Sequence, residues 1–184
     1  MKHKTYEPKT DDFSKNMVSE PAISFSLSHS HGYTSTHSGS NALKHPVALL
    51  GLSFAKKYSE VQSDFDYIAL IREGLPKNAL DNIVNVAGLS ITEVAQIIHT
   101  SDRTLRRYTS KQKLDAEQSE RVLELARLYS RGEEVFGNME LFKVWMNREV
   151  MALGDKRPKT FLDTSLGIEM LMDELGRIEQ GVFA

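Results

Sequence analysis

The sequence predicts an all-α protein. From residue 46 onward, apolar residues recur three, four and seven positions apart, the spacing that gives an amphipathic helix one apolar face. Ser, Asp, Asn or Thr precedes most of these runs, as at helix N-caps, and glycine follows several of them. No alternating apolar and polar run is bounded by hairpin turns, so we expect no strand.

The first 45 residues differ in composition from the rest. The stretch SFSLSHSHGYTSTHSGS, residues 24–40, consists largely of Ser, Thr, His and Gly, which cannot bury enough apolar surface to offset the entropy lost on ordering. We therefore predict a flexible tail over residues 1–45. It contains His29, His31 and His37, but no carboxylate stands near them at ligand spacing, so we expect no metal site.

The composition limits the class of protein. The 184 residues are 40% hydrophobic, which suits one domain with an extension. There is no cysteine, which excludes disulfides and thiolate-bound metals and fits a reducing cytoplasm, the expected location. No apolar run approaches the roughly 18–20 residues that cross a membrane, and the start MKHKTYEPKTDDFSKN lacks the apolar core of a signal peptide.

Two helices are expected in the first part of the helical region. HPVALLGLSFAKKY predicts a short apolar helix with Pro46 in its first turn. Ser63 with Asp66 predicts the start of the second helix as a capping box, and Gly74 predicts its end. The apolar residues that keep helical spacing in the second helix are Phe65, Ile68 and Ile71.

The next three helices are short and close together in sequence. They are expected at residues 76–87, 91–98 and 102–109, and Ser90 with Glu93 starts the second of them as a capping box. Their inward-facing residues are expected to be Leu80, Ile83, Val84, Ala87, Ile91, Val94, Ala95 and Ile98.

A turn of only three residues, His99-Thr100-Ser101, joins the last two of these helices. Two short helices joined in this way are typical of a helix-turn-helix unit. The small Ala95 allows the helices to cross closely, and Leu105 is the strong apolar residue that sets the inward direction of the second helix. His99 is interpreted as an isolated turn or surface residue.

Basic side chains surround the second helix of this unit. Residues 90–113 carry five basic and two acidic residues, whereas the segments 114–150 and 151–184 are each net acidic. Arginines one or two positions from Leu105 point ~100–200° away from the core at 3.6 residues per turn. Such a helix enters the DNA major groove by its N-terminal end, where an arginine fork fits guanine. The candidate DNA-binding residues are Ser101, Arg103, Thr104, Arg106, Arg107, Lys111 and Lys113.

These candidates have different expected roles. Arg103 with Arg106 or Arg107 would contact bases, whereas Lys111 and Lys113 would bind phosphates and add affinity without sequence information. The alternative is that a short basic helix is only a solvated face. Because one unit reads a short half-site, specific binding also predicts a homodimer.

Three further helices follow. Asp115 with Gln118 opens a long one, Asn138 caps NMELFKVWMN, and Thr164 caps SLGIEMLMDELGRIEQ after a loop that contains Pro158. The expected inward residues are Val122, Leu125, Ala126 and Tyr129 in the first, Leu141, Val144 and Trp145 in the second, and Leu166, Met170, Leu171, Leu175 and Ile178 in the third. Phe142 and Trp145 are open to two interpretations, core or dimer interface.

The order of several motifs resembles that of the Xre/MbcA/ParS family of antitoxins. The matching motifs are REGLP at 72–76, GLS-x-x-E-x-A at 88–95, TLRR at 104–107, LxLARLYSRGEEVFG at 123–137, RP-x-x-x-LDT-x-x-G at 157–167 and LGRIEQGVFA at 175–184. They cover about 114 residues in the family's order and spacing. The segment Gly154-Asp155-Lys156 departs from the family pattern, which often has more glycine there.

The resemblance implies an Xre-like helix-turn-helix domain followed by a C-terminal toxin-binding domain. We place them at residues 46–113 and 114–184, behind the tail. It further implies that the partner is a RES-domain toxin that consumes NAD, that the antitoxin blocks the entrance to the toxin's active site, and that it represses its own promoter. No catalytic activity and no cofactor are expected.

The last helix and its flanks are the expected toxin-binding surface. Gly167 and Gly176 inside that helix each cost ~0.5–1 kcal/mol relative to Ala, which indicates a close approach of another backbone. Thr164 has an alternative role as a helix cap. The candidate toxin-binding residues are Arg157, Leu162, Asp163, Thr164, Arg177, Glu179, Val182 and Phe183. The alternative function is a stand-alone helix-turn-helix repressor with a C-terminal dimerisation or effector domain.

Overall fold

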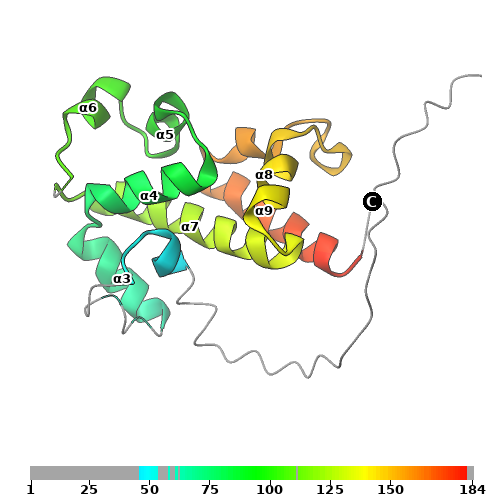
Figure 1. The fold of residues 1–184 in the computed structure, drawn as a ribbon, viewed down its shortest axis with the longest axis horizontal. Coiled ribbons are helices and arrows are strands. Elements are labelled where there is room, and N and C mark those ends of the chain that lie inside the picture. The colour runs from blue at the N-terminus through cyan, green and yellow to red at the C-terminus, as the bar shows by residue number, and fades with distance from the viewer. Residues whose placement is uncertain (1–45, 54–57, 59–60, 62, 111, 182–184) are drawn as a thin grey trace, which may run out of the picture. The chain divides into compact units, whose positions relative to one another are not determined.

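The described part of the chain is a bundle of α-helices, shown in Figure 1. The computed structural model describes residues 46–53, 58, 61, 63–110 and 112–181, so the predicted tail lies outside it. Its elements are α3 (Asp64–Glu73), α4 (Lys77–Ala87), α5 (Ile91–Ile97), α6 (Asp102–Arg107), α7 (Ala116–Phe136), α8 (Met139–Asn147), the 3₁₀ helices η1 (Met151–Leu153) and η2 (Pro158–Phe161), and α9 (Ser165–Glu179). A short helical turn at residues 46–49 precedes them.

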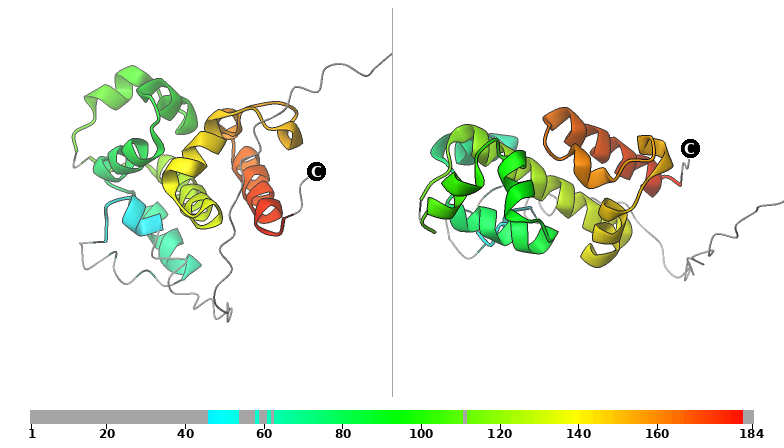
Figure 2. Two further views of the ribbon diagram at one scale, coloured as in Figure 1. Left: turned by 45° about the vertical axis from the view of Figure 1, so that its right-hand side comes forward. Right: turned by 90° about the horizontal axis from the view of Figure 1, so that it is seen from above.

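The all-α class is confirmed for the described residues. Their extended contacts are limited to two isolated bridges, Pro76 with Lys113 and Val150 with Lys156. The long helix α7 packs against α3, α4, α8 and α9. In the left view of Figure 2, α7 is seen nearly end on, with the green helices on one side and the red α9 on the other. The core therefore forms around α7.

The predicted helix starts are confirmed because they depend on local contacts. Ser63, Ser90 and Asp115 each form a capping box with the residue three positions later. The side chains of Asn138 and Thr164 accept hydrogen bonds from backbone N–H groups in the first turns of α8 and α9. These side chains satisfy donors that a helix leaves unpaired at its start.

The buried face of α3 differs from the predicted one. Phe65 is 82% exposed and Ile68 42% exposed, whereas Tyr67 and Leu70 are buried. Both pairs have helical spacing, so the sequence of α3 offers two apolar stripes. The packing of α3 on α7 selects the stripe that contains Tyr67.

The prediction for α8 was also wrong in part. Leu141 and Val144 are exposed, whereas Phe142, Trp145 and Met146 are buried. The ring of Phe142 lies 5.1 Å from that of Tyr129 and 5.8 Å from that of Trp145. These aromatic contacts, each worth roughly 0.5–1.5 kcal/mol beyond burial, turn the aromatic side of α8 inward. Phe142 and Trp145 therefore belong to the core.

A glycine within α7 allows α8 to approach closely. A Cβ atom on Gly132 would lie 2.4 Å from the ring of Phe142, so no larger residue fits without displacing that ring. The glycine is unfavourable for helix formation by roughly 1 kcal/mol, but it lets the aromatic cluster form.

Candidate functional site

The predicted helix-turn-helix unit consists of α5 and α6, whose buried residues belong to the core of the bundle. Ala95, Ile98 and Leu105 are all buried, as the sequence predicts. The N–H of Thr100 donates to the carbonyl of Ala95 at 2.8 Å, and His99 adopts a positive φ of 51°. The three-residue turn is therefore confirmed, and it fixes the direction in which α6 leaves α5.

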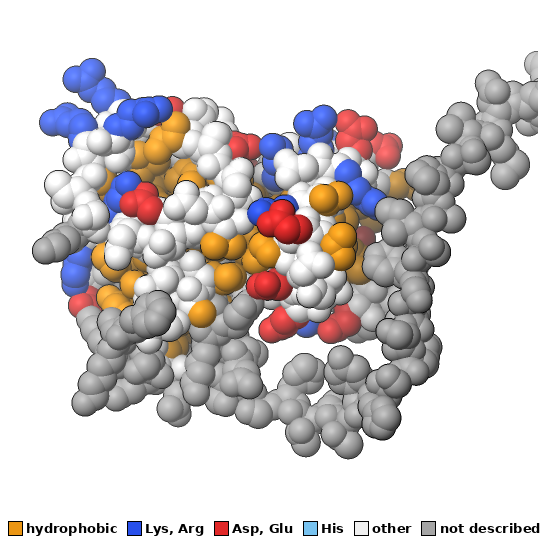
Figure 3. Space-filling model, in the orientation of Figure 1, with side chains coloured by type: hydrophobic (Ala, Val, Ile, Leu, Met, Phe, Trp, Pro, Cys, Tyr) orange, Lys and Arg blue, Asp and Glu red, His pale blue; other side chains and the backbone are white. Residues whose placement is uncertain are grey.

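Three arginines form the outer face of α6. Arg103, Arg106 and Arg107 are exposed, and Leu105 is the buried residue of this helix. Within the part of the chain that the structure describes, none of the three has an ion-pair partner. Figure 3 shows blue side chains gathered over α6 at the upper left of the molecule. This face combines positive charge with planar donors and leaves both available to a ligand.

Ser101 and Thr104 hold the start of α6. The Ser101 hydroxyl accepts a hydrogen bond from the Thr104 N–H at 3.1 Å, and the two hydroxyls lie 2.9 Å apart. The hydroxyl of Thr92 donates to the Asp102 carboxylate at 2.9 Å, which joins the first turns of α5 and α6. These contacts hold the backbone of the first turn of α6, where Arg103 lies.

Of the two predicted phosphate-binding lysines, Lys113 lies among the described residues and forms an ion pair. Lys113 lies 2.8 Å from the carboxylate of Glu73 and also donates to the Glu73 carbonyl. This exposed ion pair leaves Lys113 a weaker source of positive potential than the α6 arginines. Lys111 lies outside the described residues.

The start of α9 is built by its own chain. The Thr164 hydroxyl accepts a hydrogen bond from the Gly167 N–H at 3.1 Å, so the capping role is confirmed. A Cβ atom on Gly167 would lie 2.1 Å from the carbonyl oxygen of Phe161, whereas one on Gly176 would meet nothing within 4 Å. The close backbone that Gly167 accommodates is therefore that of η2, and Gly176 accommodates none among the described residues.

The charged candidates of α9 are paired within this chain. Arg177 donates to the buried carboxylate of Glu174 at 2.8 Å. Glu179 accepts from Arg131 of α7, which also contacts Glu134. These contacts turn Arg177 and Glu179 toward neighbours on α9 and α7.

The other predicted toxin-binding residues have varied positions. Leu162 is 1% exposed, so its side chain belongs to the core, which corrects its assignment to the surface. Asp163 and Arg157 are exposed. Val182 and Phe183 lie outside the described residues.

The outer face of α9 carries two apolar side chains that were predicted to be inward. Leu166 is 68% exposed and Met170 is 41% exposed. They stand four positions apart, on one side of the helix, with Leu171 and Leu175 buried on the other side. The spacing was visible in the sequence, but the sequence alone did not show which of two apolar sides faces α7.

A buried arginine joins the helix-turn-helix unit to α9. Arg121 of α7 donates to the carbonyls of Ile97 at 3.1 Å and Leu162 at 2.8 Å. It also contacts the carboxylate of Glu124 at 2.6 Å and the hydroxyl of Ser165 at 2.8 Å. Sequence analysis missed this residue because its partners lie far apart in the chain.

His99 lies in the turn and is exposed, as the sequence predicts, but it is not isolated. Its Nδ1 lies 3.1 Å from Glu117 of α7, and its Nε2 lies 3.0 Å from the carbonyl oxygen of Asp163. Both partners are acceptors, so the doubly protonated ring satisfies both. The Asp163 carbonyl and then the Glu117 carboxylate raise the pKa of His99.

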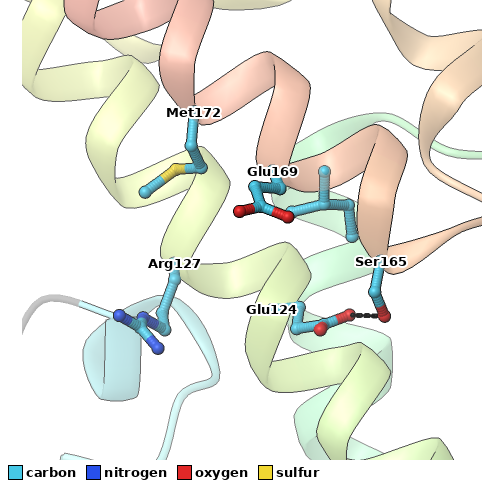
Figure 4. Close-up of a pocket in the computed structure, with 6 residues that line it drawn as sticks. Glu124, Arg127, Ser165, Glu169 and Met172 are labelled. Carbon is cyan, nitrogen blue, oxygen red and sulfur yellow. Dashed lines mark hydrogen bonds between the residues drawn. The ribbon is translucent and has the colours of Figure 1, made fainter.

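An open pocket of about 420 Å³ lies between α7 and α9, and Figure 4 shows the side chains that line it. Its lining residues are Glu124, Arg127, Ser165, Ile168, Glu169 and Met172. The Ser165 hydroxyl donates to Glu124 at 3.2 Å. Glu124 and Arg127 come from α7, and Ser165 and Glu169 come from α9.

Metal ligands do not cluster in the part of the chain that the structure describes, where no three His, Cys, Asp or Glu side chains converge. The histidines of residues 29–37 lie outside it. Among the described helices, none combines the length and apolar character required to span a bilayer.

Comparison with known proteins identifies both halves. Residues 66–127 match the model of the antitoxin Xre-like helix-turn-helix domain, and residues 131–181 match that of the antitoxin Xre/MbcA/ParS C-terminal toxin-binding domain. An "Antitoxin Xre" of Photorhabdus laumondii is 31% identical over 116 residues, which cover 62% of this chain and 78% of that protein.

Two further relatives have similar coverage. An "Antitoxin Xre" of Yersinia enterocolitica is 28% identical over 62% of this chain and 78% of its own length. A "Prs ADP-ribosylating antitoxin" of a Sphingobium species is 27% identical over 71% of this chain and 89% of its own length. The chain therefore belongs to the Xre/MbcA/ParS family of antitoxins, with a helix-turn-helix domain followed by a toxin-binding domain.

Proposed function

We propose that this antitoxin neutralises a RES-domain toxin that consumes NAD, by covering the entrance to the toxin's active site, and that it represses its own promoter through α6. The observation that carries the DNA half of this proposal is the exposed arginine face of α6, which has no ion-pair partner among the residues that the structure describes. The toxin half rests on α9, which lies in the matched toxin-binding domain and carries exposed apolar side chains.

The nature of the toxin is supported by one relative. The Sphingobium protein is named as an ADP-ribosylating antitoxin. ADP-ribosylation takes its ADP-ribose from NAD, so a partner that uses NAD is the chemistry that this name favours. The antitoxin itself acts by binding in this proposal, without a catalytic step.

We propose that the toxin-binding surface centres on Leu166 and Met170, with Asp163 and Thr164 at its edge and Glu179, Arg177, Val182 and Phe183 toward the C-terminal end. Exposed apolar side chains lose water on docking and give the centre of an interface most of its energy. Arg177 and Glu179 have partners in this chain, so they would join the surface as fixed ion pairs.

We propose that DNA binding uses a homodimer, since one α6 helix spans only a half-site. Arg103 with Arg106 or Arg107 reads bases, Thr104 adds a smaller contact, Ser101 fixes the helix start, and Lys113 and Lys111 bind phosphates. The net negative charge of the chain does not cancel the positive potential at α6, because the field of a surface charge extends over only about one Debye length of ~8–10 Å.

Co-expression with the product of the neighbouring gene tests the toxin half. The wild-type chain is expected to restore growth and the cellular NAD level when that gene encodes the toxin.

Deletion of Gly181–Ala184 tests the tip of the chain. Unchanged inhibition and complex formation by the deletion variant would remove Val182 and Phe183 from the proposed surface.

Gel shifts with the region upstream of the gene test the DNA half. The wild-type chain is expected to bind that region in preference to unrelated duplex. Binding of the upstream region without rescue from any neighbouring toxin would favour the stand-alone repressor instead.

A further inference from the structure

A second group of unpaired cations lies on the segment between α8 and η2. We define the basic loop as Arg148, Lys156 and Arg157, which are all exposed and have no ion-pair partner among the described residues. The Val150 N–H donates to the Lys156 carbonyl at 3.1 Å, which holds the two arms of the loop together. In Figure 3, blue side chains gather at the upper edge over α6, and blue and red side chains lie together over the segment that follows α8, which also carries the exposed Glu149 and Asp155.

The end of the basic loop meets the helix-turn-helix unit. Lys159, two residues after Arg157, lies 3.0 Å from the carboxylate of Glu93 in the first turn of α5. The same turn contacts the start of α6 through Thr92 and Asp102. The basic loop therefore lies next to the first turn of α5, which also contacts the start of α6.

This position matters because of how such units dock on DNA. The second helix enters the major groove, while the first helix crosses the sugar-phosphate backbone. Although partial burial of Glu93 raises its pKa, hydrogen bonds from Ser90 and Lys159 hold the pKa of this carboxyl below its ordinary value. An uncompensated carboxylate beside phosphates would repel them, and Lys159 supplies the compensating charge.

We propose that the basic loop is a second DNA contact, in which Lys156 and Arg157 bind phosphates beside α5. The loop belongs to the half that matches the toxin-binding domain, so this half would serve DNA as well as toxin. The inference rests on the proposed DNA binding by α6 and assigns Arg157 to phosphate rather than to toxin. Such contacts raise affinity for every sequence and leave base preference to α6.

The double variant Lys156→Gln/Arg157→Gln tests this inference. Neither side chain has a partner within the described residues, so the fold is expected to persist. Binding should be measured between 50 and 200 mM salt on a duplex of the upstream region and on an unrelated duplex of equal length. The slope of log affinity against log salt should become shallower by about 1.8, which is ~0.9 for each lost phosphate contact. Binding to the two duplexes should weaken equally.

Arg127→Gln is the matched control, because it removes an exposed cation that lines the pocket between α7 and α9. This control should retain the wild-type slope, and the double variant should retain toxin neutralisation. A wild-type slope in the double variant would overturn the inference. Loss of toxin neutralisation with unchanged DNA binding would also overturn it, because the loop would then be a toxin contact. Failure of the wild-type chain to bind either duplex would instead overturn the proposed function on which the inference depends.

Discussion

The candidate binding residues of α6 and α9 differ in whether their charges are paired within the described part of the chain. Arg103, Arg106 and Arg107 on α6 have no ion-pair partners in the described part of the chain, whereas Arg177 and Glu179 on α9 are paired with Glu174 and Arg131. α9 also leaves two apolar side chains exposed, Leu166 and Met170, beside the exposed carboxylates of Glu169 and Asp173. We therefore expect α6 to attract phosphates at a distance, with an affinity that falls as the salt concentration rises. We expect α9 to gain binding free energy when its apolar side chains lose contact with water.

The largest expected effect comes from breaking the link between the two surfaces. Arg121→Met removes a buried cation with four polar contacts and leaves the Glu124 carboxylate without its closest partner. Loss of one member of a buried pair should lower the free energy of unfolding by about 3–5 kcal/mol. Urea unfolding followed by circular dichroism measures this. Arg127→Met, an exposed arginine on the same helix, should change stability by less than about 0.5 kcal/mol.

The next effect concerns the apolar surface alone. Leu166→Asp/Met170→Asp places two charges where we propose that the toxin docks, and we expect a loss of at least ~2 kcal/mol in toxin affinity. Both residues are exposed, so thermal stability should be nearly unchanged. Calorimetric titration with the toxin measures the loss, and DNA binding by the variant serves as the control. Wild-type toxin affinity would place the interface elsewhere.

A change in α6 should have the complementary result. Arg103→Ala is expected to lose about 1–3 kcal/mol in binding to the specific duplex, the value of one bidentate base contact. Binding to unrelated duplex should fall much less, and toxin affinity should not change. Equal losses on both duplexes would show that Arg103 binds phosphate and does not read a base.

The smallest expected effect depends on pH. The pKa of His99 is raised in the folded protein, so its contribution to stability is present in full below the unfolded pKa and is lost as pH rises through the folded pKa. His99→Gln should therefore lower the melting temperature more at pH 5 than at pH 8. The difference should be small because the ring is half exposed. An equal change at both pH values would show that protonation of His99 does not contribute.

The exposure of the α6 arginines could be predicted from the sequence because it depends on one short segment. The arginine face of α6 followed from the position of Leu105 within a single helix, and the structure places these side chains in solvent as expected. The exposed side of α9, where we propose that the toxin binds, was less predictable. Leu162 proved to be buried, and Leu166 and Met170 proved to be exposed, because the orientation of α9 depends on α7 and η2.

The sequence by itself determined the local structure of this protein. Helix starts at Ser63, Ser90, Asp115 and Thr164 follow from side chains that bond to backbone N–H groups three residues away. Tertiary structure alone decided which apolar stripe of α3, α8 and α9 is buried, and which distant carbonyls accept hydrogen bonds from Arg121. A cap is complete within one turn, whereas a stripe is buried only when another helix covers it, and that choice belongs to the packed core.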